Sequence, residues 1–298
     1  MNAPAHLIIN ADDYGYFDCV SDGILEAARR GRVTATGLFA NAPDFDRQVA
    51  RLAEVPHLDL GVHLNLTDQT PLSPAMAQAL ARQGGVFPGK FAMVGSILSR
   101  RLPLAVVEAE WRAQIERCLN AGLTIRFLNA HEHLHMLPPL FRLTRRLASE
   151  YGIAHVRLTA PESLPRSASA LIRDGAMALF ARLPGRRAAA APRFLGMAES
   201  GRLSLGYLER TLPRLAPGGI YELMCHPGLC RPAQIPRPEL LNYHDWRQEF
   251  ASLTAERTGE LLRAHNVRLI GYRHLRIRAG RLEAVTPESS SAPGGPSA

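Results

Sequence analysis

The sequence predicts an α/β fold, a single-domain distorted β/α barrel. Strand-like and helix-like segments alternate along the chain, and this alternation indicates a parallel sheet with helices packed outside it. Six or seven such units occupy roughly 270 residues, which is typical of a closed or nearly closed barrel. No GxGxxG motif follows the first strand-like segment, so a dinucleotide-binding sheet is not favoured.

The first part of the chain alternates strongly. An apolar strand is predicted over residues 6–11. A helix is predicted over 20–31, because apolar residues recur there at helical spacing and Gly31 then ends the pattern. The elements predicted next are a strand over 33–40, a helix over 44–55 and a strand over 58–66.

The second part is less regular. Residues 67–100 contain Pro and Gly and few strand signals, so they predict an insertion over one rim of the barrel. The chain ends in a Ser/Pro/Gly-rich stretch, and we expect one domain over 1–280 and a disordered tail over 281–298. The remaining predicted elements are a helix over 104–122, a segment over 127–137 that begins as a strand, a helix over 141–152, strands over 154–159 and 219–228, a helix around 247–265 and a strand over 267–272.

The composition is ordinary for a soluble globular protein, with 46% hydrophobic and 21% charged residues. No apolar run approaches the roughly 18 residues of a membrane span, and the N-terminus lacks the basic region of a signal peptide. We therefore expect a cytoplasmic protein. The 4 cysteines are too few for a disulfide framework and indicate free, mostly buried thiols.

The net charge of +8 comes mainly from arginine, since Lys90 is the only lysine. Arginines are densest over residues 182–193, after a helix-like segment over 167–181. One interpretation is a solvated basic loop, and the other is affinity for anionic headgroups or phosphate. No aromatic stacking pattern accompanies these arginines, so a nucleic-acid partner is not expected.

Polar groups follow the predicted strands at the edge where a β/α barrel carries its chemistry. Each of four strands that are distant in sequence brings an acid or an imidazole to this edge. The residues are Asp12 and Asp13 after the first strand, His63 in the strand over 58–66, His131, His133 and His135 in the strand that starts at 127, and Cys225 and His226 after the strand at 219.

The run "HEHLH" over 131–135 is the strongest of these signals. In an extended chain, its three histidines alternate and point to one face. Histidine and aspartate are suitable ligands for a divalent metal, which would offset the charge of Asp13 and activate a water molecule. Asp12 is then the candidate to take the proton from that water, and His226 the candidate to protonate the leaving group. These parts predict metal-assisted hydrolysis of an amide or ester.

Four blocks resemble one known family. They are "NADDYG" (10–15), "GVHLNLT" (61–67), "NAHEHLHMLP" (129–138) and "ELMCHPG" (222–228), and the closing "RLIGYRHL" (268–275) agrees with them. Their order and spacing resemble those of the YdjC-like, or ChbG-type, carbohydrate deacetylases over roughly residues 6–275. The resemblance implies a distorted, TIM-like β/α barrel of the polysaccharide-deacetylase kind. It also implies one divalent metal ion, with Mg and Zn both open, and an N-acetylated amino sugar as substrate.

The resemblance also implies individual roles. The metal ligands would be Asp13, His63 and His131, with His131 chosen over His133 by block alignment alone. Asp12 would be the catalytic base, and His226 would lie on the second catalytic side of the site. The chain departs from the family pattern at Asn129, where Asp is common, and at Tyr14, where Phe is common. Residues expected to bind substrate or to support the ligands are His133, His135, Asn129 and Asn65.

A narrower resemblance concerns residues 194–212, "FLGMAESGRLSLGYLERTL", which look like a segment of the hopanoid-biosynthesis-associated HpnK type. It implies an N-acetylglucosaminyl hopanoid or another lipid-linked sugar, and a place at the inner face of the membrane. A soluble chito-oligosaccharide is the alternative, and peripheral membrane contact and a homodimer both stay open. Two other functions also stay open: a metal-dependent phosphoesterase, and a sugar- or lipid-binding barrel without catalysis.

Overall fold

The computed structural model describes residues 3–160 and 191–285 of the chain. The predicted helix over 167–181, most of the basic loop over 182–193, and residues 286–298 of the predicted tail lie outside the described residues. All four cysteines are free and buried, as predicted. Within the described part, no helix has both the length and the apolar character that a transmembrane span requires.

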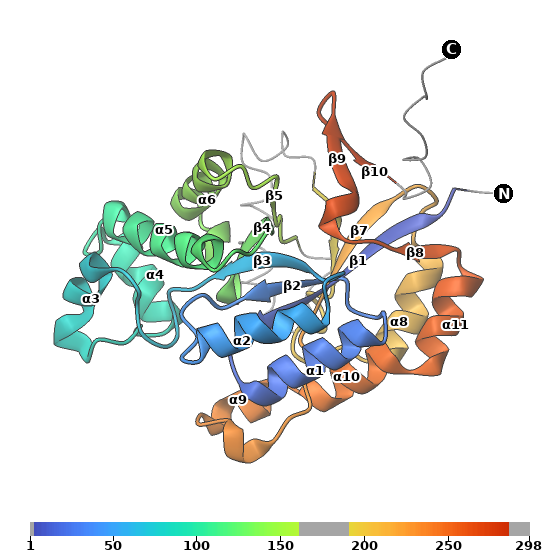
Figure 1. The fold of residues 1–298 in the computed structure, drawn as a ribbon, viewed down its shortest axis with the longest axis horizontal. Coiled ribbons are helices and arrows are strands. Elements are labelled where there is room, and N and C mark those ends of the chain that lie inside the picture. The colour runs from blue at the N-terminus through green and yellow to red at the C-terminus, as the bar shows by residue number, and fades with distance from the viewer. Residues whose placement is uncertain (1–2, 161–190, 286–298) are drawn as a thin grey trace, which may run out of the picture.

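A parallel sheet of eight strands forms the centre of the molecule and curls into an incomplete barrel (Figure 1). The strands are β1 (Ala5–Tyr14), β2 (Ala35–Leu38), β3 (Asp59–Leu64), β4 (Ile125–Ala130), β5 (His155–Val156), β6 (Arg193–Leu195), β7 (Ile220–Cys225) and β8 (Val267–Leu269). Their order is β5-β4-β3-β2-β1-β7-β6, and β8 pairs with the first residues of β1. The predicted α/β fold with a distorted barrel is confirmed.

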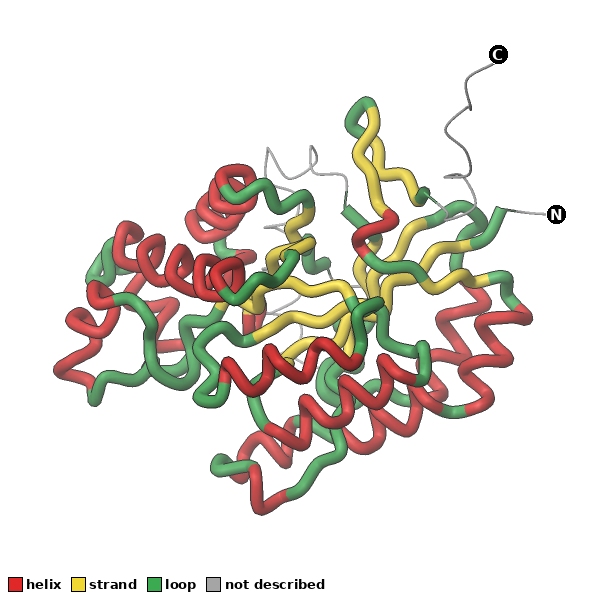
Figure 2. Tube along the Cα trace, viewed as in Figure 1, coloured by secondary structure: helices red, strands yellow, loops and turns green. Residues whose placement is uncertain are grey.

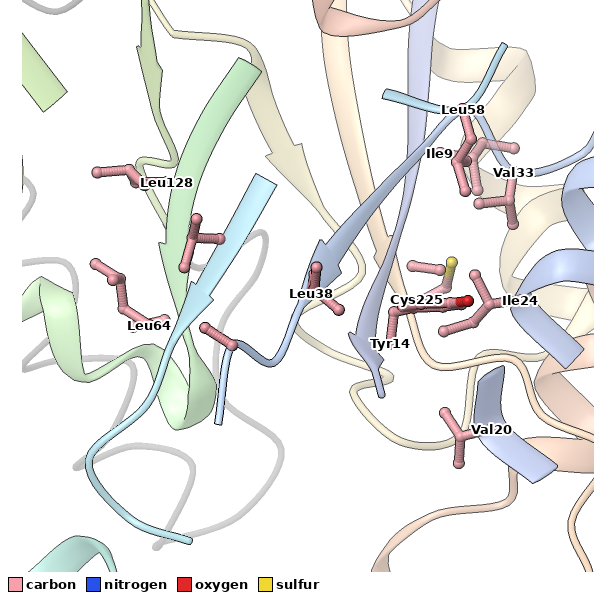
Figure 3. Close-up of a cluster of buried hydrophobic side chains, with 14 of the residues drawn as sticks. Ile9, Tyr14, Val20, Ile24, Val33, Leu38, Leu58, Leu64, Leu128 and Cys225 are labelled. Atoms are coloured by element: carbon pink, nitrogen blue, oxygen red, sulfur yellow. The ribbon is translucent and has the colours of Figure 1, made fainter. Parts of the chain in front are cut away.

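Helices cover the outside of this sheet (Figure 2). They are α1 (Asp18–Arg29), α2 (Phe45–Arg51), α3 (Pro74–Leu80), α4 (Lys90–Leu98), α5 (Leu104–Asn120), α6 (Pro138–Glu150), α8 (Leu205–Thr211), α9 (Pro238–Tyr243), α10 (Trp246–Thr254) and α11 (Glu256–Ala264). In the core, Val20 and Ile24 of α1 lie near Tyr14 and Cys225 at the ends of β1 and β7 (Figure 3). Burial of these apolar faces against the sheet is the main stabilising contribution.

The close packing of α1 depends on one glycine. A Cβ on Gly23 would lie 2.4 Å from the Cα of Gly228, which is backbone and cannot move away cheaply. Glycine here lets α1 approach the loop after β7, and that loop begins with His226. The helix therefore supports the backbone of a predicted site residue.

Several predicted boundaries differ from the structure. The predicted helix around 247–265 is two helices, because Ala255 is extended (φ −56°, ψ 142°) between α10 and α11. The insertion over 67–100 contains α3 and α4, and the sequence did not indicate β6, α8 or α9. These short elements follow Pro- and Gly-rich stretches, where a periodic pattern is too brief to be recognised.

The predicted disordered tail begins too early. Arg281–Ala284 form β10, which pairs antiparallel with β9 (Leu275–Arg278). Ala279 and Gly280 make the tight turn between them, with φ of 48° and 74°. Leu282 and Ala284 pack against the buried cluster that contains Ile8, Phe127 and Tyr272, which explains why this segment is ordered.

The strand order determines where the predicted polar residues lie in the fold. The strands predicted to carry polar groups are β1, β3, β4 and β7, and in the sheet they lie as β4-β3-β2-β1-β7. Because all pairings among them are parallel, their carboxyl ends share one edge.

Candidate metal centre and active site

Two adjacent carboxylates end β1, and both are buried. In a regular strand they would point to opposite faces of the sheet. The pairing of β1 with β2 shifts register between Ala11 and Tyr14, and Asp13 adopts a left-handed backbone with φ of 71°. This break lets both Asp12 and Asp13 line the same cavity.

Asp13, His63 and His131 form a group that could hold a metal ion. The Asp13 Oδ1 atom lies 3.2 Å from His63 Nε2 and 3.1 Å from His131 Nδ1. One ligand atom from each of the three residues lies within 4.8 Å of the others, as sharing one ion requires. Burial raises the pKa of Asp13, but the two histidines outweigh burial and hold that pKa well below its ordinary value.

Asn129 links this group to Asp12. Its Oδ1 lies 2.9 Å from His63 Nδ1, and its Nδ2 donates to Asp12 Oδ1 at 2.9 Å. Since Asn129 Oδ1 only accepts, His63 carries its proton on Nδ1 and leaves Nε2 free to ligate. An aspartate at position 129 could not donate to Asp12. The amide at position 129 therefore fits both of its neighbours.

Glycine on β2 leaves room for this hydrogen bond. A Cβ on Gly37 would lie 3.1 Å from both Asn129 Oδ1 and His63 Nδ1. A larger side chain would push the His63 ring or the amide aside.

Asp12 is held by a buried arginine. Arg157 donates from Nη1 to Asp12 Oδ2 at 2.5 Å and from Nη2 to Asp12 Oδ1 at 2.9 Å. Its Nε donates to Glu222 Oε1 at 2.6 Å. Burial raises the pKa of Asp12, but the charge and hydrogen bonds of Arg157, together with the nearby His63 and His226, outweigh burial and leave that pKa below its ordinary value. Asp12 is therefore an ionised carboxylate at neutral pH.

His226 has a carboxylate partner of its own. Its backbone N–H donates to Glu249 Oε2, and its Nδ1 lies 3.7 Å from Glu249 Oε1. That separation is longer than an ordinary hydrogen bond. Burial lowers the pKa of His226, but Glu249, with smaller contributions from Asp13 and Asp12, outweighs burial and raises that pKa to about 9. His226 is therefore protonated at neutral pH.

The prediction that all three histidines of "HEHLH" share one face is wrong. Strand β4 ends at Ala130, and His131–Met136 form a 3-10 turn in which Glu132 and His133 have φ of 50° and 57°. This turn separates the three rings. His131 faces Asp13, His133 lines the cavity with its Nδ1 3.3 Å from Thr159 Oγ1, and His135 lies behind, donating from Nε2 to the carbonyl of Arg157.

Asn65 does not line the cavity. Its Nδ2 donates to the carbonyl of Asp68 at 2.7 Å, and its Oδ1 accepts from the backbone N–H of Thr67 at 3.0 Å. It therefore shapes the loop after β3, whose residues Thr67 and Asp68 reach the cavity instead. Asn129 and His135 likewise support the site from behind.

The cavity has a volume of about 540 Å³, and its lining combines polar and apolar residues. The candidate catalytic and metal-binding residues in the lining are Asp12, Asp13, His63, His131 and His226. The apolar residues are Val94, Leu134, Met136, Leu137, Met197 and Leu240, and the further charged residues are Asp68, Lys90, Glu132, Arg237 and Glu239.

Sequence reasoning missed three charged residues. Arg157 and Glu222 stand within apolar strand segments, "AHVRLT" and "IYELMC". A charge in such a strand was a usable signal, because a buried charge needs a partner. Glu249 lies in α10, where a glutamate is ordinary, so no local signal marked it.

Comparison with known proteins gives one family. The family model described as YdjC-like protein matches residues 6–264. A carbohydrate deacetylase of Geobacillus stearothermophilus is 31% identical over 274 residues, which cover 91% of this chain and 98% of that protein. A carbohydrate deacetylase of Oceanobacillus iheyensis is 39% identical over 146 residues, but the match spans only 49% of this chain and 61% of that protein.

Among solved structures, a protein of Enterococcus faecalis named for cellobiose-phosphate cleavage has a similar fold. Its TM-score is 0.70 at 25% sequence identity, and the match covers 91% of this chain and 98% of that one.

Proposed function

The chain belongs to the YdjC-like protein family, and from this premise we propose that it removes an N-acetyl group from an amino sugar by metal-dependent hydrolysis. One observation carries the proposal. A group of possible metal ligands lies in a single cavity with an ionised carboxylate, Asp12, and a protonated imidazole, His226.

The donor set fits a divalent cation. One carboxylate and two imidazoles suit Zn²⁺ or another transition ion better than Mg²⁺, which prefers oxygen ligands. Asp13, His63 and His131 would hold the ion and leave its remaining positions facing the cavity. A bound cation would polarise the acetyl carbonyl and lower the pKa of water.

Asp12 would act as the general base. Its bonds to Arg157 and Asn129 keep it ionised and fix its orientation at the cavity wall. It would take a proton from the attacking water as the bond to the acetyl carbon forms.

His226 would act as the general acid. Glu249 keeps its imidazole protonated, so it can give a proton to the amide nitrogen as the C–N bond breaks. The products would be acetate and a free amine on the sugar.

The apolar residues of the cavity support a narrower proposal for the substrate. A free chito-oligosaccharide presents mostly hydroxyl groups, whereas the lining includes Leu137, Met197 and Leu240. An amino sugar linked to an apolar aglycone, such as an N-acetylglucosaminyl hopanoid, would bury apolar surface there. The resemblance of residues 194–212 to the hopanoid-associated type agrees with this.

The alternative functions require other features. A two-metal phosphoesterase needs further ligands, and across residues 3–160 and 191–285 the possible metal ligands form a single group. A purely structural ion is normally enclosed by four protein ligands, whereas this group opens onto a cavity. Both observations favour hydrolysis at one ion.

The test is acetate release from N-acetylglucosamine, chito-oligosaccharides and N-acetylglucosaminyl lipids, with and without a chelator. We expect acetate from at least one substrate and none after metal removal. Asp12→Asn should keep one metal per chain and lose nearly all turnover. Asp46→Asn, an exposed carboxylate on α2, is the matched control and should be unaffected. Near-normal turnover by Asp12→Asn would contradict the assignment of Asp12 as the general base. Two metal ions per chain would favour the phosphoesterase.

A further inference from the structure

The segment between Asp68 and Glu108 has an unusual charge distribution. Residues 69–107 contain no acidic side chain, and their basic residues are Arg82, Lys90, Arg100 and Arg101. Lys90 lies 3.9 Å from Glu132, so the three arginines carry most of the uncompensated charge. The segment is therefore cationic, and residues 261–282 form a second cationic segment, with six arginines and no acidic side chain.

The same segment exposes large apolar side chains. In the part of the chain that the structure describes, the only others are Tyr243 and Ile277. Those in the segment are Val86 (45% exposed), Phe91 (89%), Leu98 (60%) and Leu104 (43%). Single exposed apolar residues are ordinary, but apolar residues that gather in one patch mark an interaction surface.

Helix α4 presents two of them in the same direction. Phe91 and Leu98 are seven residues apart, which is about two helical turns, so they lie on one face of the helix. The opposite face carries Met93 and Ile97, which are buried in the core. The outward face is therefore unpartnered although the helix itself is firmly packed.

This surface borders the cavity. Gly89, Lys90 and Val94, at the beginning of α4, line the cavity. Figure 1 shows α3 and α4 together at the end of the molecule opposite α8 and α11. A partner seated on the outward face of α4 would therefore lie beside the cavity.

We propose that this surface, the α4 surface, docks on an anionic lipid bilayer. It comprises Phe91 and Leu98 on the outward face of α4, together with Arg100 and Arg101, which directly follow that helix. Phe91 and Leu98 enter the boundary between headgroups and acyl chains, and the arginines lie at the level of the anionic headgroups.

Charge complementarity selects this partner over a second copy of the chain. A two-fold dimer would place the surface against itself and bring the same cations together. An anionic bilayer supplies the opposite charge and an apolar interior at the same time. The proposal rests on the α4 surface and not on the proposed catalytic function.

The experiment is vesicle flotation of the full chain. Wild-type protein should bind vesicles of phosphatidylcholine with about 30% phosphatidylglycerol, and bind pure phosphatidylcholine weakly. Phe91→Ser with Leu98→Ser should weaken binding about tenfold for each residue. Arg100→Gln with Arg101→Gln should weaken binding to the anionic vesicles about thirtyfold. Ile277→Ser changes an exposed apolar residue between Arg276 and Arg278 on β9, and so tests the second cationic segment; it should bind as wild type.

Two results would overturn the proposal directly. One is absence of binding by the wild type, and the other is undiminished binding by the Phe91/Leu98 variant. The arginine-rich residues 182–193 are the same in every variant. A difference in vesicle binding between the wild type and the Phe91/Leu98 variant is therefore caused by the α4 surface. A dimer in light scattering that only the Phe91/Leu98 variant loses, without vesicle binding, would instead identify a second copy as the partner.

Because Phe91 and Leu98 lie outside the cavity, their variant should keep its melting temperature and its rate of acetate release from a water-soluble substrate. Loss of vesicle binding with retained acetate release would support docking, whereas failure of acetate release in the wild type would count against the catalytic function alone.

Discussion

Replacing Arg157 by Met tests the physical basis of the site. The Arg157 side chain has no exposed surface, and it makes two hydrogen bonds to Asp12 and one to Glu222. Methionine has similar volume but no charge and no donor. The variant therefore leaves two buried carboxylates without their common partner.

The expected cost follows from the burial of these charges. Breaking a buried ion pair by removing one partner costs about 3–5 kcal/mol. For a chain of this size that corresponds to a fall in melting temperature of about 10 °C. Arg146→Met is the matched control, because Arg146 pairs with Glu108 and Glu150 but is 49% exposed. It should destabilise the protein far less than Arg157→Met, because solvent screens an exposed ion pair.

The pH dependence gives a sharper test. In the wild type the pKa of Asp12 lies below its ordinary value, so Asp12 contributes stability above its unfolded-state pKa and loses it as pH falls through the folded pKa. In Arg157→Met, burial loses its largest opposing contribution, so the pKa of Asp12 rises. The resulting penalty is then present at neutral pH and disappears as pH falls toward the unfolded value of about 4.

The assay is denaturant unfolding of both proteins, followed by circular dichroism, from pH 8 to pH 5. The difference in unfolding free energy between wild type and Arg157→Met should narrow as pH falls. A difference that stays constant, or one no larger than that of Arg146→Met, would refute the reasoning about unpaired carboxylates.

Three other outcomes are expected. Asn129→Asp loses the donor to Asp12 and adds a negative charge beside it, so turnover should fall about tenfold or more, and an unchanged kcat would contradict this. Glu249→Gln removes the charge that helps to raise the pKa of His226 to about 9, so the alkaline limb of the kcat/KM profile should move to lower pH. A limb that stays in place would show that Glu249 does not control the protonation of His226. A divalent ion at 100 times its Kd should add about 2.7 kcal/mol to the unfolding free energy, which a chelator should reverse, and an unchanged melting temperature would argue against a bound ion.

The sequence by itself determined the fold class and the general location of the site. Apolar periodicity is a local property, so the strands, the main helices and their alternation were visible without the structure. In a parallel barrel the strand ends share one edge, and this rule alone brought Asp13, His63 and His131 to the same region. The sequence did not determine short elements such as β10. This strand is ordered because it packs against the cluster that contains Ile8 and Phe127.

Only the tertiary structure decided which side chains meet. The strand rule could not choose among His131, His133 and His135, because a left-handed turn at Glu132 and His133 separates their rings. Nor could it pair Asp12 with Arg157, since these residues are 145 positions apart and come together only when β1 and β5 enter the same sheet. The pattern of apolar residues along a chain indicates which residues are buried. The protonation state of a buried charge depends on its partners, and only the folded protein brings these partners within a few ångströms.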